Sequence, residues 1–317
     1  MSEASLSMAP QGRPATWRIW YRLARPFSLT ASVLPVLVGG SVAFATGAFA
    51  HVDLFLAMLV ASVLIQIATN MFNEYYDYKH GLDTPQTVGI AGAIVRGYVA
   101  PITVLAAAMG CLVLALGLGT YIVGRTTPEV FLVGVACAFA GYLYTGGPLP
   151  IAYTPLGELE VFVFMGPVMV GLTYFIQAGQ LSAPAIWASL PVGCLVASIL
   201  LANNLRDHVA DRQVGRRTVP VVLGRKVGLA IYVALLVGAS LTTAAAVVMG
   251  ALPWPALLPL ITARTPIRLV GLYLSHEEPR ALDRAVRGSA GLHARFNLLL
   301  ALGIALGPMV GWVHATL

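Results

Sequence analysis

Charged residues are scarce in this chain. Asp, Glu, Lys and Arg make up only 10% of its 317 residues, whereas hydrophobic residues make up 58%. Soluble domains carry roughly 25% charged residues, so water is not the main solvent of this protein. The sequence also lacks the Gly-rich signatures of P-loop and dinucleotide-binding folds. Its three cysteines stand far apart in apolar stretches, which favours packing over a disulfide or metal role.

Long apolar segments are present instead. A bilayer core about 30 Å thick requires roughly 20 apolar residues for each helical span. Nine segments satisfy or approach this length: 27–47, 52–73, 101–123, 129–146, 158–178, 182–203, 227–249, 252–270 and 290–314. We predict an all-α integral membrane protein with about nine transmembrane helices around a central cavity, capped by cytoplasmic helices and loops. Residues 1–25 are a polar tail, and 26–317 are a single transmembrane domain of two weak four-helix repeats plus a last helix.

Basic residues are distributed unevenly between the predicted loops. The loops after the second, fourth, sixth and eighth spans hold every Lys and Arg except Arg125, the four that precede the first span (Arg13, Arg18, Arg22 and Arg25), and Arg264, Arg268 and Arg295, which fall inside the last two segments. Because cytoplasmic loops retain basic residues, we place these loops and the N-terminus on the cytoplasmic side of the inner (plasma) membrane. The net charge of +6 then reflects topology and attraction to membrane lipid, and it does not indicate a nucleic-acid partner.

A cluster rich in Asn and Asp follows the second predicted span. It reads N-M-F-N-E-Y-Y-D-Y-K-H-G-L-D, from Asn70 to Asp83. If the helix continues to about residue 79, Asn70, Asn73 and Asp77 share one face. Gly81 then ends the helix, so that Asp83 can fold back toward this face. The pattern predicts an oxygen-rich pocket at the membrane boundary.

A second cluster places Asn203, Asp207 and Asp211 at successive i+4 positions. Carboxylates gathered near lipid repel one another and lose hydration, so they require a counter-charge. Mg²⁺ prefers oxygen ligands and fills its remaining positions with water and substrate phosphate, so two such clusters predict a bridged diphosphate. The cations expected to bind that diphosphate are Lys79, Arg96, Arg206, Arg212, Arg216 and Arg217. For any one of these residues, a capping or topology-setting role in an ordinary loop is the alternative.

A third inner loop, G-Y-L-Y-T-G-G-P-L-P-I-A-Y-T-P-L-G-E, is rich in tyrosine and almost free of charge. Tyr142, Tyr144 and Tyr153, together with Glu158, could shape an aromatic acceptor site. The tyrosines could equally be interfacial anchors. The residues alone leave both roles open.

These motifs resemble those of the UbiA superfamily of intramembrane aromatic prenyltransferases over nearly the whole chain. The chain is most similar to the branch that prenylates 1,4-dihydroxy-2-naphthoate in menaquinone synthesis. The strings that carry this similarity are N-x-F-N-E-Y-Y-D-Y-K-x-G-L-D-T, V-G-I-A-G-A-I-V-R and G-G-P-L-P-I-A-Y-T-P-L-G-E. The resemblance implies transfer of a polyprenyl chain from polyprenyl diphosphate to this aromatic acid with decarboxylation, giving demethylmenaquinone.

The resemblance also implies roles for individual residues. Mg²⁺ and diphosphate would be held by Asn73, Asp77, Asp83, Asn203, Asp207 and Asp211, with Lys79, Arg206, Arg216 and Arg217 assisting. Glu74 departs from the pattern, because many members have Asp at this position. Two alternatives are a related enzyme acting on 4-hydroxybenzoate or homogentisate and, from another class, a secondary transporter. Transporters usually bury their ion sites mid-bilayer, whereas these acids are expected at one rim.

Overall fold

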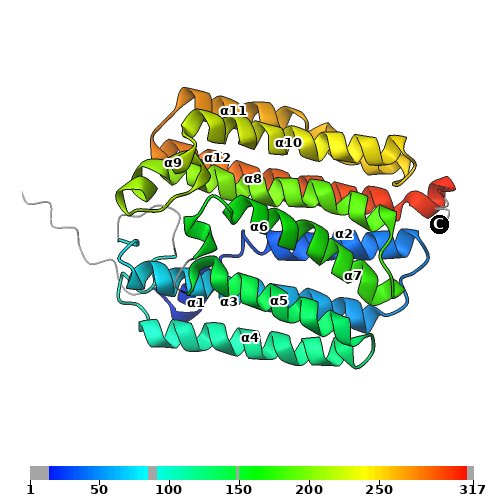
Figure 1. Ribbon diagram of the computed structural model, residues 1–317, viewed down its shortest axis with the longest axis horizontal. Coiled ribbons are helices and arrows are strands. Elements are labelled where there is room, and N and C mark those ends of the chain that lie inside the picture. Colours follow the sequence, from blue (N-terminus) through cyan, green and yellow to red (C-terminus); the bar gives the residue numbers. More distant parts are fainter. Residues whose placement is uncertain (1–13, 85–90, 148–149, 313–317) are drawn as a thin grey trace, which may run out of the picture.

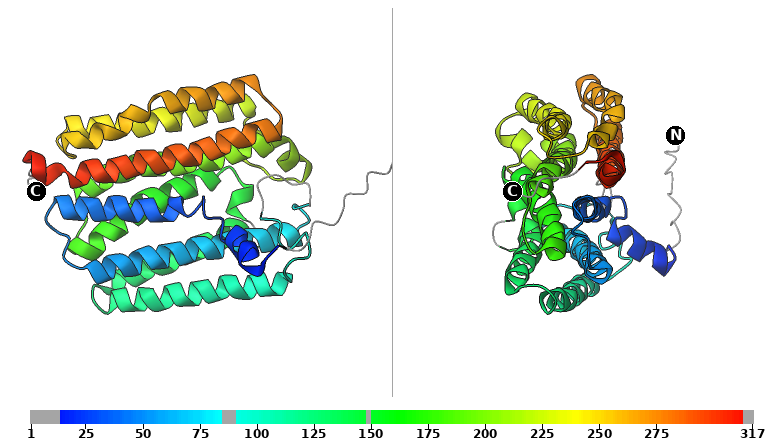
Figure 2. Two further views of the ribbon diagram at one scale, coloured as in Figure 1. Left: turned by 180° about the vertical axis from the view of Figure 1, so that it is seen from behind. Right: turned by 90° about the vertical axis from the view of Figure 1, so that its right-hand side faces the viewer.

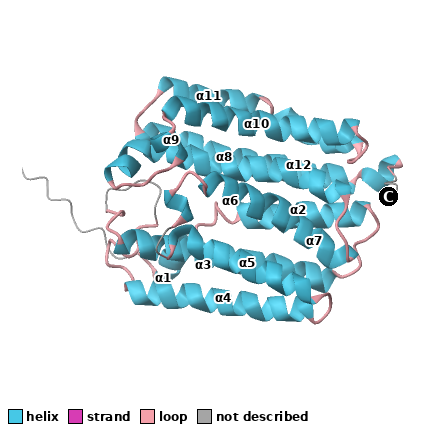
Figure 3. Ribbon diagram, viewed as in Figure 1, coloured by secondary structure: helices cyan, strands magenta, loops and turns pink. Residues whose placement is uncertain are grey.

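The computed structural model describes residues 14–84, 91–147 and 150–312, and within these ranges every regular element is a helix (Figures 1 and 3). The all-α prediction is therefore confirmed. The long helices run side by side along one direction (Figure 2). Arg13 and the rest of the first 13 residues, together with parts of two motif strings at 85–90 and 148–149, lie outside the described residues.

Seven helices, or runs of consecutive helices, are long and apolar enough to cross a membrane. They are α3 (Val52–Lys79), α4 (Pro101–Val123), α5 (Pro128–Thr145), the run α6 (Gly157–Val163), η2 (Phe164–Val168) and α7 (Met169–Ala178), then α8 (Ala183–Gln213), α10 (Arg225–Val248), and the run η3 (Trp254–Thr262) and α11 (Arg264–Ser275). Apolar α2 (Thr30–Ala45) is shorter, and α12 (Pro279–Ala305) is long but begins with charged residues. Each predicted span overlaps one of these elements, so the multi-pass fold is confirmed.

The last predicted span differs from the structure at both limits. Helix α12 begins at Pro279, well before residue 290, and ends at Ala305, after which a short turn η4 (Gly307–Val310) follows. Charged residues interrupt the apolar pattern here, but the helix continues through them. Pro279 is well suited to the first helical turn, and Arg287 Nε donates to Asp283 Oδ2, four residues earlier, at 2.7 Å. The predicted inner loop 271–289 is correspondingly mostly helical, and only residues 276–278 connect α11 to α12.

The connections divide between the two ends of the bundle (Figure 1). We call the end at which α3 and α8 finish the motif end. It also holds the N-terminal helix α1 (Thr16–Ala24), which buries Ile19 and Leu23, and the short helix α9 (Val219–Val222). Arg125 lies at the opposite end, where it pairs with Asp53 at 3.1 Å. Most of the basic residues therefore lie toward one end, as the loop pattern predicts, although Arg264 belongs to helix α11 and not to a loop.

Helix α8 is the most enclosed of the membrane-length helices. A close approach to the α6–η2–α7 run helps to fix its position, since a Cβ built on Gly166 would lie 2.8 Å from the Cα of Gly193. Near the motif end, the Tyr273 hydroxyl of α11 donates to the Ala202 carbonyl of α8 at 2.9 Å. The second Asn/Asp cluster therefore lies on a helix held from several sides.

Candidate active site

The first cluster has the backbone geometry that its sequence predicts. Helix α3 ends at Lys79, and Gly81 adopts a φ of +70°, which glycine tolerates because it has no Cβ. The chain then turns back, so that the backbone amides of Leu82 and Asp83 donate to the Asp77 carbonyl at 2.8 and 3.4 Å. The predicted return of Asp83 toward Asp77 is confirmed.

Asp83 is half-buried and lies among other negative charges. Burial, followed by the charges of Asp77 and Glu74, raises the pKa of Asp83 to about 7. The positive charges of Arg25 and Arg216 oppose this rise only in part. A carboxylate in this position is stabilised by any additional cation, which is the environment expected of a metal ligand.

Arg216 joins the two motifs. Its Nη2 donates to Asp77 Oδ1 at 2.7 Å, and its Nη1 lies 3.4 Å from Asp211 Oδ1. The guanidinium also stacks over the Tyr153 ring, 4.4 Å from the centroid, and the Tyr153 hydroxyl donates to Asp77 Oδ1 at 2.8 Å. Although burial acts in the opposite direction, the charges of Asp77 and its neighbours raise the pKa of Arg216. Asp residues on α3 and α8 thus converge on one cation supplied by the chain.

Asp207 has a different partner from Asp211. Arg206 donates two hydrogen bonds to Asp207, from Nε to Oδ1 at 2.8 Å and from Nη2 to Oδ2 at 2.6 Å. Its remaining nitrogen, Nη1, donates to Asp283 Oδ1 on α12 at 3.0 Å. Asn203 turns back onto its own helix, where Nδ2 donates to the Ile199 carbonyl at 3.1 Å. The three residues of the second cluster share a helix face, as predicted, but do not share a partner.

The predicted acceptor tyrosines lie around the end of α5. The hydroxyls of Tyr142 and Tyr76 are 3.2 Å apart, and Thr145 donates to Asn73 Oδ1 at 2.6 Å. Tyr144 lies within electrostatic range of two groups of residues, Glu158 and Glu160 on α6, and Asp77 and Arg216 in the motif cluster. Tyr144 is therefore close to carboxylates of α6 and to Asp77 of the first motif.

Glu158 is held at one oxygen only. Its Oε1 accepts a hydrogen bond from Asn204 Nδ2 on α8 at 2.9 Å. Glu158 is only 8% exposed, and its buried Oε2 has no protein partner within the described ranges. A buried acceptor without a partner costs free energy, so this atom is available to a ligand hydroxyl.

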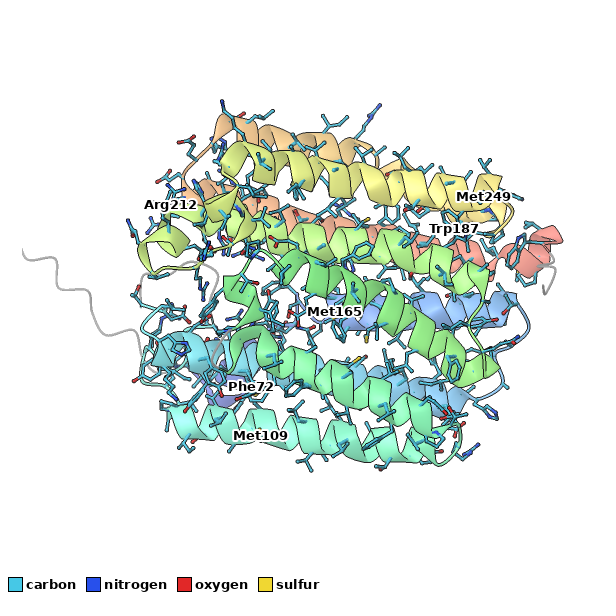
Figure 4. All side chains as sticks on the ribbon, viewed as in Figure 1. Phe72, Met109, Met165, Trp187, Arg212 and Met249 are labelled. Atoms are coloured by element: carbon cyan, nitrogen blue, oxygen red, sulfur yellow. The ribbon has the colours of Figure 1, made fainter. Side chains whose placement is uncertain are left out.

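The predicted diphosphate-binding cations fall into two groups. Arg206 and Arg216 pair directly with motif carboxylates. The other four, Lys79, Arg96, Arg212 and Arg217, have exposed side chains. Arg96 folds over Gly92 and donates to the Ala91 carbonyl at 3.4 Å. Arg212, labelled in Figure 4, contacts the Val221 carbonyl at 3.4 Å and none of the motif carboxylates within the described ranges.

Four polar residues that support the site were not predicted as site residues: Glu74, Thr145, Thr218 and Asp283. Glu74 is buried, and its carboxylate accepts hydrogen bonds from three consecutive amides of residues 92–94, at 2.6 Å from Ala93. Thr218 lies 3.4 Å from Asp211 Oδ2, and Asp283 anchors Arg206. Glu74 departs from the family pattern, which is a usable signal. The contact of Asp283 has no local sequence signal, because its partner lies 77 positions away.

The oxygen donors suit a hard divalent cation such as Mg²⁺. Within the described ranges, however, no three Asp, Glu, His or Cys side chains are close enough together to form a metal shell. Arg216 lies between Asp77 and Asp211, and Arg206 occupies Asp207. The chain's own cations therefore compensate Asp77, Asp207 and Asp211, whereas Asp83 forms no ion pair within the described ranges.

An all-helical membrane bundle with paired acidic motifs at one end is a class of protein with known relatives. Residues 32–289 match the UbiA prenyltransferase family, and the chain belongs to this family. A 1,4-dihydroxy-2-naphthoate octaprenyltransferase of Bacillus subtilis is 40% identical over 301 residues, which cover 94% of this chain and 95% of the relative. The enzyme of the same name from Mycobacterium tuberculosis is 32% identical and covers 93% of this chain and 99% of the relative. Family membership sets aside the transporter alternative.

Solved structures agree on the fold. An apo UbiA homologue from Aeropyrum pernix superimposes with a TM-score of 0.68 at 19% identity, covering 88% of this chain and 98% of that one. A UbiA homologue from Archaeoglobus fulgidus, bound to DMAPP and Mg²⁺, gives a TM-score of 0.60 at 18% identity, covering 89% and 99%. At these identities the likeness establishes the fold alone.

Proposed function

We propose that this protein transfers a polyprenyl chain from polyprenyl diphosphate to 1,4-dihydroxy-2-naphthoate with loss of carbon dioxide, giving demethylmenaquinone. The names of the relatives at 40% and 32% identity support the reaction. The observation that carries it within this molecule is the convergence of Asp77 and Asp211 on Arg216. Such a cluster of acids with an embedded arginine suits a metal–diphosphate complex.

Mg²⁺ is the cofactor that the donor set fits. Its ligands would come from Asn73, Asp77, Asp83, Asn203, Asp207 and Asp211, and when bound it would neutralise negative charge on the departing diphosphate. Asn73, Asp77, Asp207 and Asp211 are the catalytic residues among these, because they would lie closest to the reacting diphosphate. The Archaeoglobus fulgidus homologue, which was solved with DMAPP and Mg²⁺ bound, supports this cofactor.

The chain's own cations bind and orient the diphosphate. Arg216 and Arg206 already lie beside the motif carboxylates, so their free donor capacity is directed to the same region. Lys79, Arg96 and Arg217 are exposed at the motif end, where they can attract the anionic substrate from solution. Pairing two arginines with carboxylates keeps them fixed before substrate arrives, which lowers the reorganisation needed for catalysis.

The tyrosines and Glu158 bind the aromatic acceptor. Tyr142, Tyr144 and Tyr153 offer ring faces beside the motif cluster. Glu158 Oε2 hydrogen-bonds the acceptor hydroxyl next to the carboxylate-bearing ring carbon, while Asn204 holds Oε1. Electron density on the ring rises as this proton is drawn away, which favours attack on the prenyl carbon.

Glu158 takes up and later returns the one proton that moves during the reaction. The prenyl C–O bond breaks with its electron pair leaving on diphosphate, and the ring carbon that carries the carboxylate bonds to the prenyl carbon. Glu158 Oε2 takes the hydroxyl proton, which leaves a ketone beside the new bond. The C–CO₂ bond then breaks, its electron pair restores the aromatic ring, and Glu158 returns the proton to the oxygen.

The site faces the cytoplasm in this proposal. Most Lys and Arg residues belong to segments at the motif end, and basic residues are retained on the cytoplasmic side of membranes. We therefore assign the protein to the inner (plasma) membrane, with its N-terminus and active-site loops inside. Accessibility of a cysteine introduced at exposed Lys79, measured in sealed inverted and right-side-out vesicles, tests this orientation.

A direct assay tests the reaction. Purified protein is incubated with 1,4-dihydroxy-2-naphthoate and a long-chain prenyl diphosphate, with Mg²⁺ or with EDTA, and the products are identified by mass spectrometry. Mg²⁺-dependent prenylated product with release of carbon dioxide is the expected result. Turnover of 4-hydroxybenzoate or homogentisate without turnover of the naphthoate would overturn the assignment of the acceptor.

A further inference from the structure

A pocket that combines arginines with apolar side chains opens on a neighbouring stripe of α8, next to the motif aspartates. Its volume is about 320 Å³, and it is lined by His208, Val209, Arg212, Gln213, Pro220 and Arg225. Residues 208 and 212 each follow a motif aspartate by one position, which turns them about 100° around the helix axis from Asp207 and Asp211. The pocket lies where α8, α9 and α10 meet at the motif end (Figures 1 and 4).

Four of the six lining residues have polar side chains, two of them arginines, and none of the six is acidic. Arg225 Nη2 donates to the carbonyls of Tyr273 and His276 at 2.6 and 2.9 Å, whereas its Nε is buried without a partner in the described part of the chain. Arg225 Nη1 also lies 4.0 Å from Oε1 of the exposed Glu277. Within the described ranges, Arg212 forms no ion pair and has one weak contact, 3.4 Å from the Val221 carbonyl, so its charge is available to a ligand.

The start of helix α10 also favours an anion in this pocket. Arg225 is the first residue of this 24-residue helix, whose N-terminus has no side-chain cap. The unpaired amides and the dipole of such a terminus attract negative charge. The shared chemistry is that of a phosphate group.

The rim of the pocket identifies the kind of phosphate. Exposed aliphatic side chains surround the donors: Val209 is 60% exposed, Leu223 52% and Val227 44%. They lie where the apolar part of α10 begins, which is the depth of lipid headgroups and upper acyl chains. A free anion gains nothing from aliphatic neighbours, whereas a phospholipid uses both parts of such a surface.

We propose that this pocket binds the headgroup phosphate of an anionic phospholipid from the adjacent leaflet, with Arg212 and Arg225 as donors and the acyl chains along Val209 and Val227. Arg212, predicted from sequence to bind the substrate diphosphate, holds lipid in this arrangement. The proposal does not depend on the prenyl-transfer activity, because the pocket uses a different stripe of α8 from the motif aspartates.

Native mass spectrometry of the full-length protein in neutral detergent tests the proposal. Phosphatidylglycerol and phosphatidylcholine with identical acyl chains are titrated against wild type, Arg212→Gln and Arg212→Lys. Loss of one surface cation is expected to weaken phosphatidylglycerol binding about five-fold in Arg212→Gln, with little change for phosphatidylcholine. The Lys variant keeps the charge and should retain most of the binding.

Arg284→Gln is the matched control, since Arg284 is also exposed toward the motif end but lies on α12, outside the pocket lining. Equal phosphatidylglycerol affinity in Arg212→Gln and Arg284→Gln would overturn the proposal. Inorganic phosphate and glycerol phosphate are added as competitors. If either displaces the lipid at a concentration comparable to that of the lipid itself, the pocket is a general anion site and the lipid assignment fails.

Discussion

Replacing Arg216 by Gln isolates the role of the cation between the two motifs. The substitution removes the 2.7 Å bond to Asp77 Oδ1, the longer contact with Asp211 and the stacking on Tyr153. A hydrogen bond to a charged group contributes about 1.5–3 kcal/mol, and a cation–π contact of a partly exposed arginine adds about 0.5–1 kcal/mol. We therefore expect a loss of about 2–4 kcal/mol in the free energy of unfolding when no metal is present.

Mg²⁺ should restore part of this loss. Without Arg216, the three carboxylates of Asp77, Asp83 and Asp211 lose a positive charge that compensates them, so a divalent cation gains more by binding beside them. Thermal unfolding in detergent, measured with EDTA and with millimolar Mg²⁺, gives the comparison. The melting temperature of Arg216→Gln should fall by several degrees in EDTA, and its increase with Mg²⁺ should exceed that of wild type.

Arg217→Gln is the control for this experiment. Arg217 is adjacent and exposed, and its backbone amide donates to the Tyr153 carbonyl at 2.8 Å, a bond that the substitution leaves in place. Its melting temperature in EDTA should stay close to that of wild type. If Arg216→Gln melts like wild type in EDTA, or if Mg²⁺ raises both melting temperatures equally, Arg216 does not compensate the motif carboxylates as we argue.

Three other predictions follow from the same contacts. Asp77→Asn and Asp207→Asn should each abolish turnover while leaving folded protein in the membrane, and more than a small residual rate by product assay would contradict their metal roles. Glu158→Gln keeps an acceptor for Asn204 but cannot take a proton, so kcat should fall about 100-fold, whereas prenyl diphosphate affinity by calorimetry should stay unchanged. Glu74→Gln weakens the hydrogen bonds to residues 92–94 and should destabilise the protein by about 1–3 kcal/mol; unaltered hydrogen exchange of the Ala93 amide would refute this.

Local geometry at the site was predictable from the sequence because helix spacing and glycine conformation are local properties. The spacing of Asn73 and Asp77 gave a helical face, and the positive φ of Gly81 turns Asp83 back as expected. The apolar segments likewise indicated the helices, since a membrane core demands length and low polarity. The start of α12 at Pro279 was missed, because its charged first turns disrupt the apolar signal on which the prediction relied.

Partner choice was not predictable in the same way. Arg216 contacts Asp77 across 139 positions, and Thr145 contacts Asn73 across 72. Such pairs depend on how the ends of α3, α5 and α8 meet, which no local pattern records. The sequence grouped six cations as equivalent diphosphate ligands, whereas Arg206 and Arg216 alone among those six form ion pairs with motif carboxylates in the described ranges.

The difference between Asp77 and Asp207 shows that equivalent positions in a predicted repeat need not have equivalent environments. They are 130 positions apart and each follows an Asn by four residues. Asp77 shares its Oδ1 between Arg216 and Tyr153, whereas both oxygens of Asp207 are occupied by Arg206, which Asp283 holds in turn. A metal ion that binds both aspartates must therefore share or displace a guanidinium in each case. At Asp207, on α8, that guanidinium is held by two hydrogen bonds, whereas at Asp77, on α3, it is held by one. Binding at the two motifs should consequently be unequal, and recruiting Asp207 on α8 should cost more free energy than recruiting Asp77 on α3.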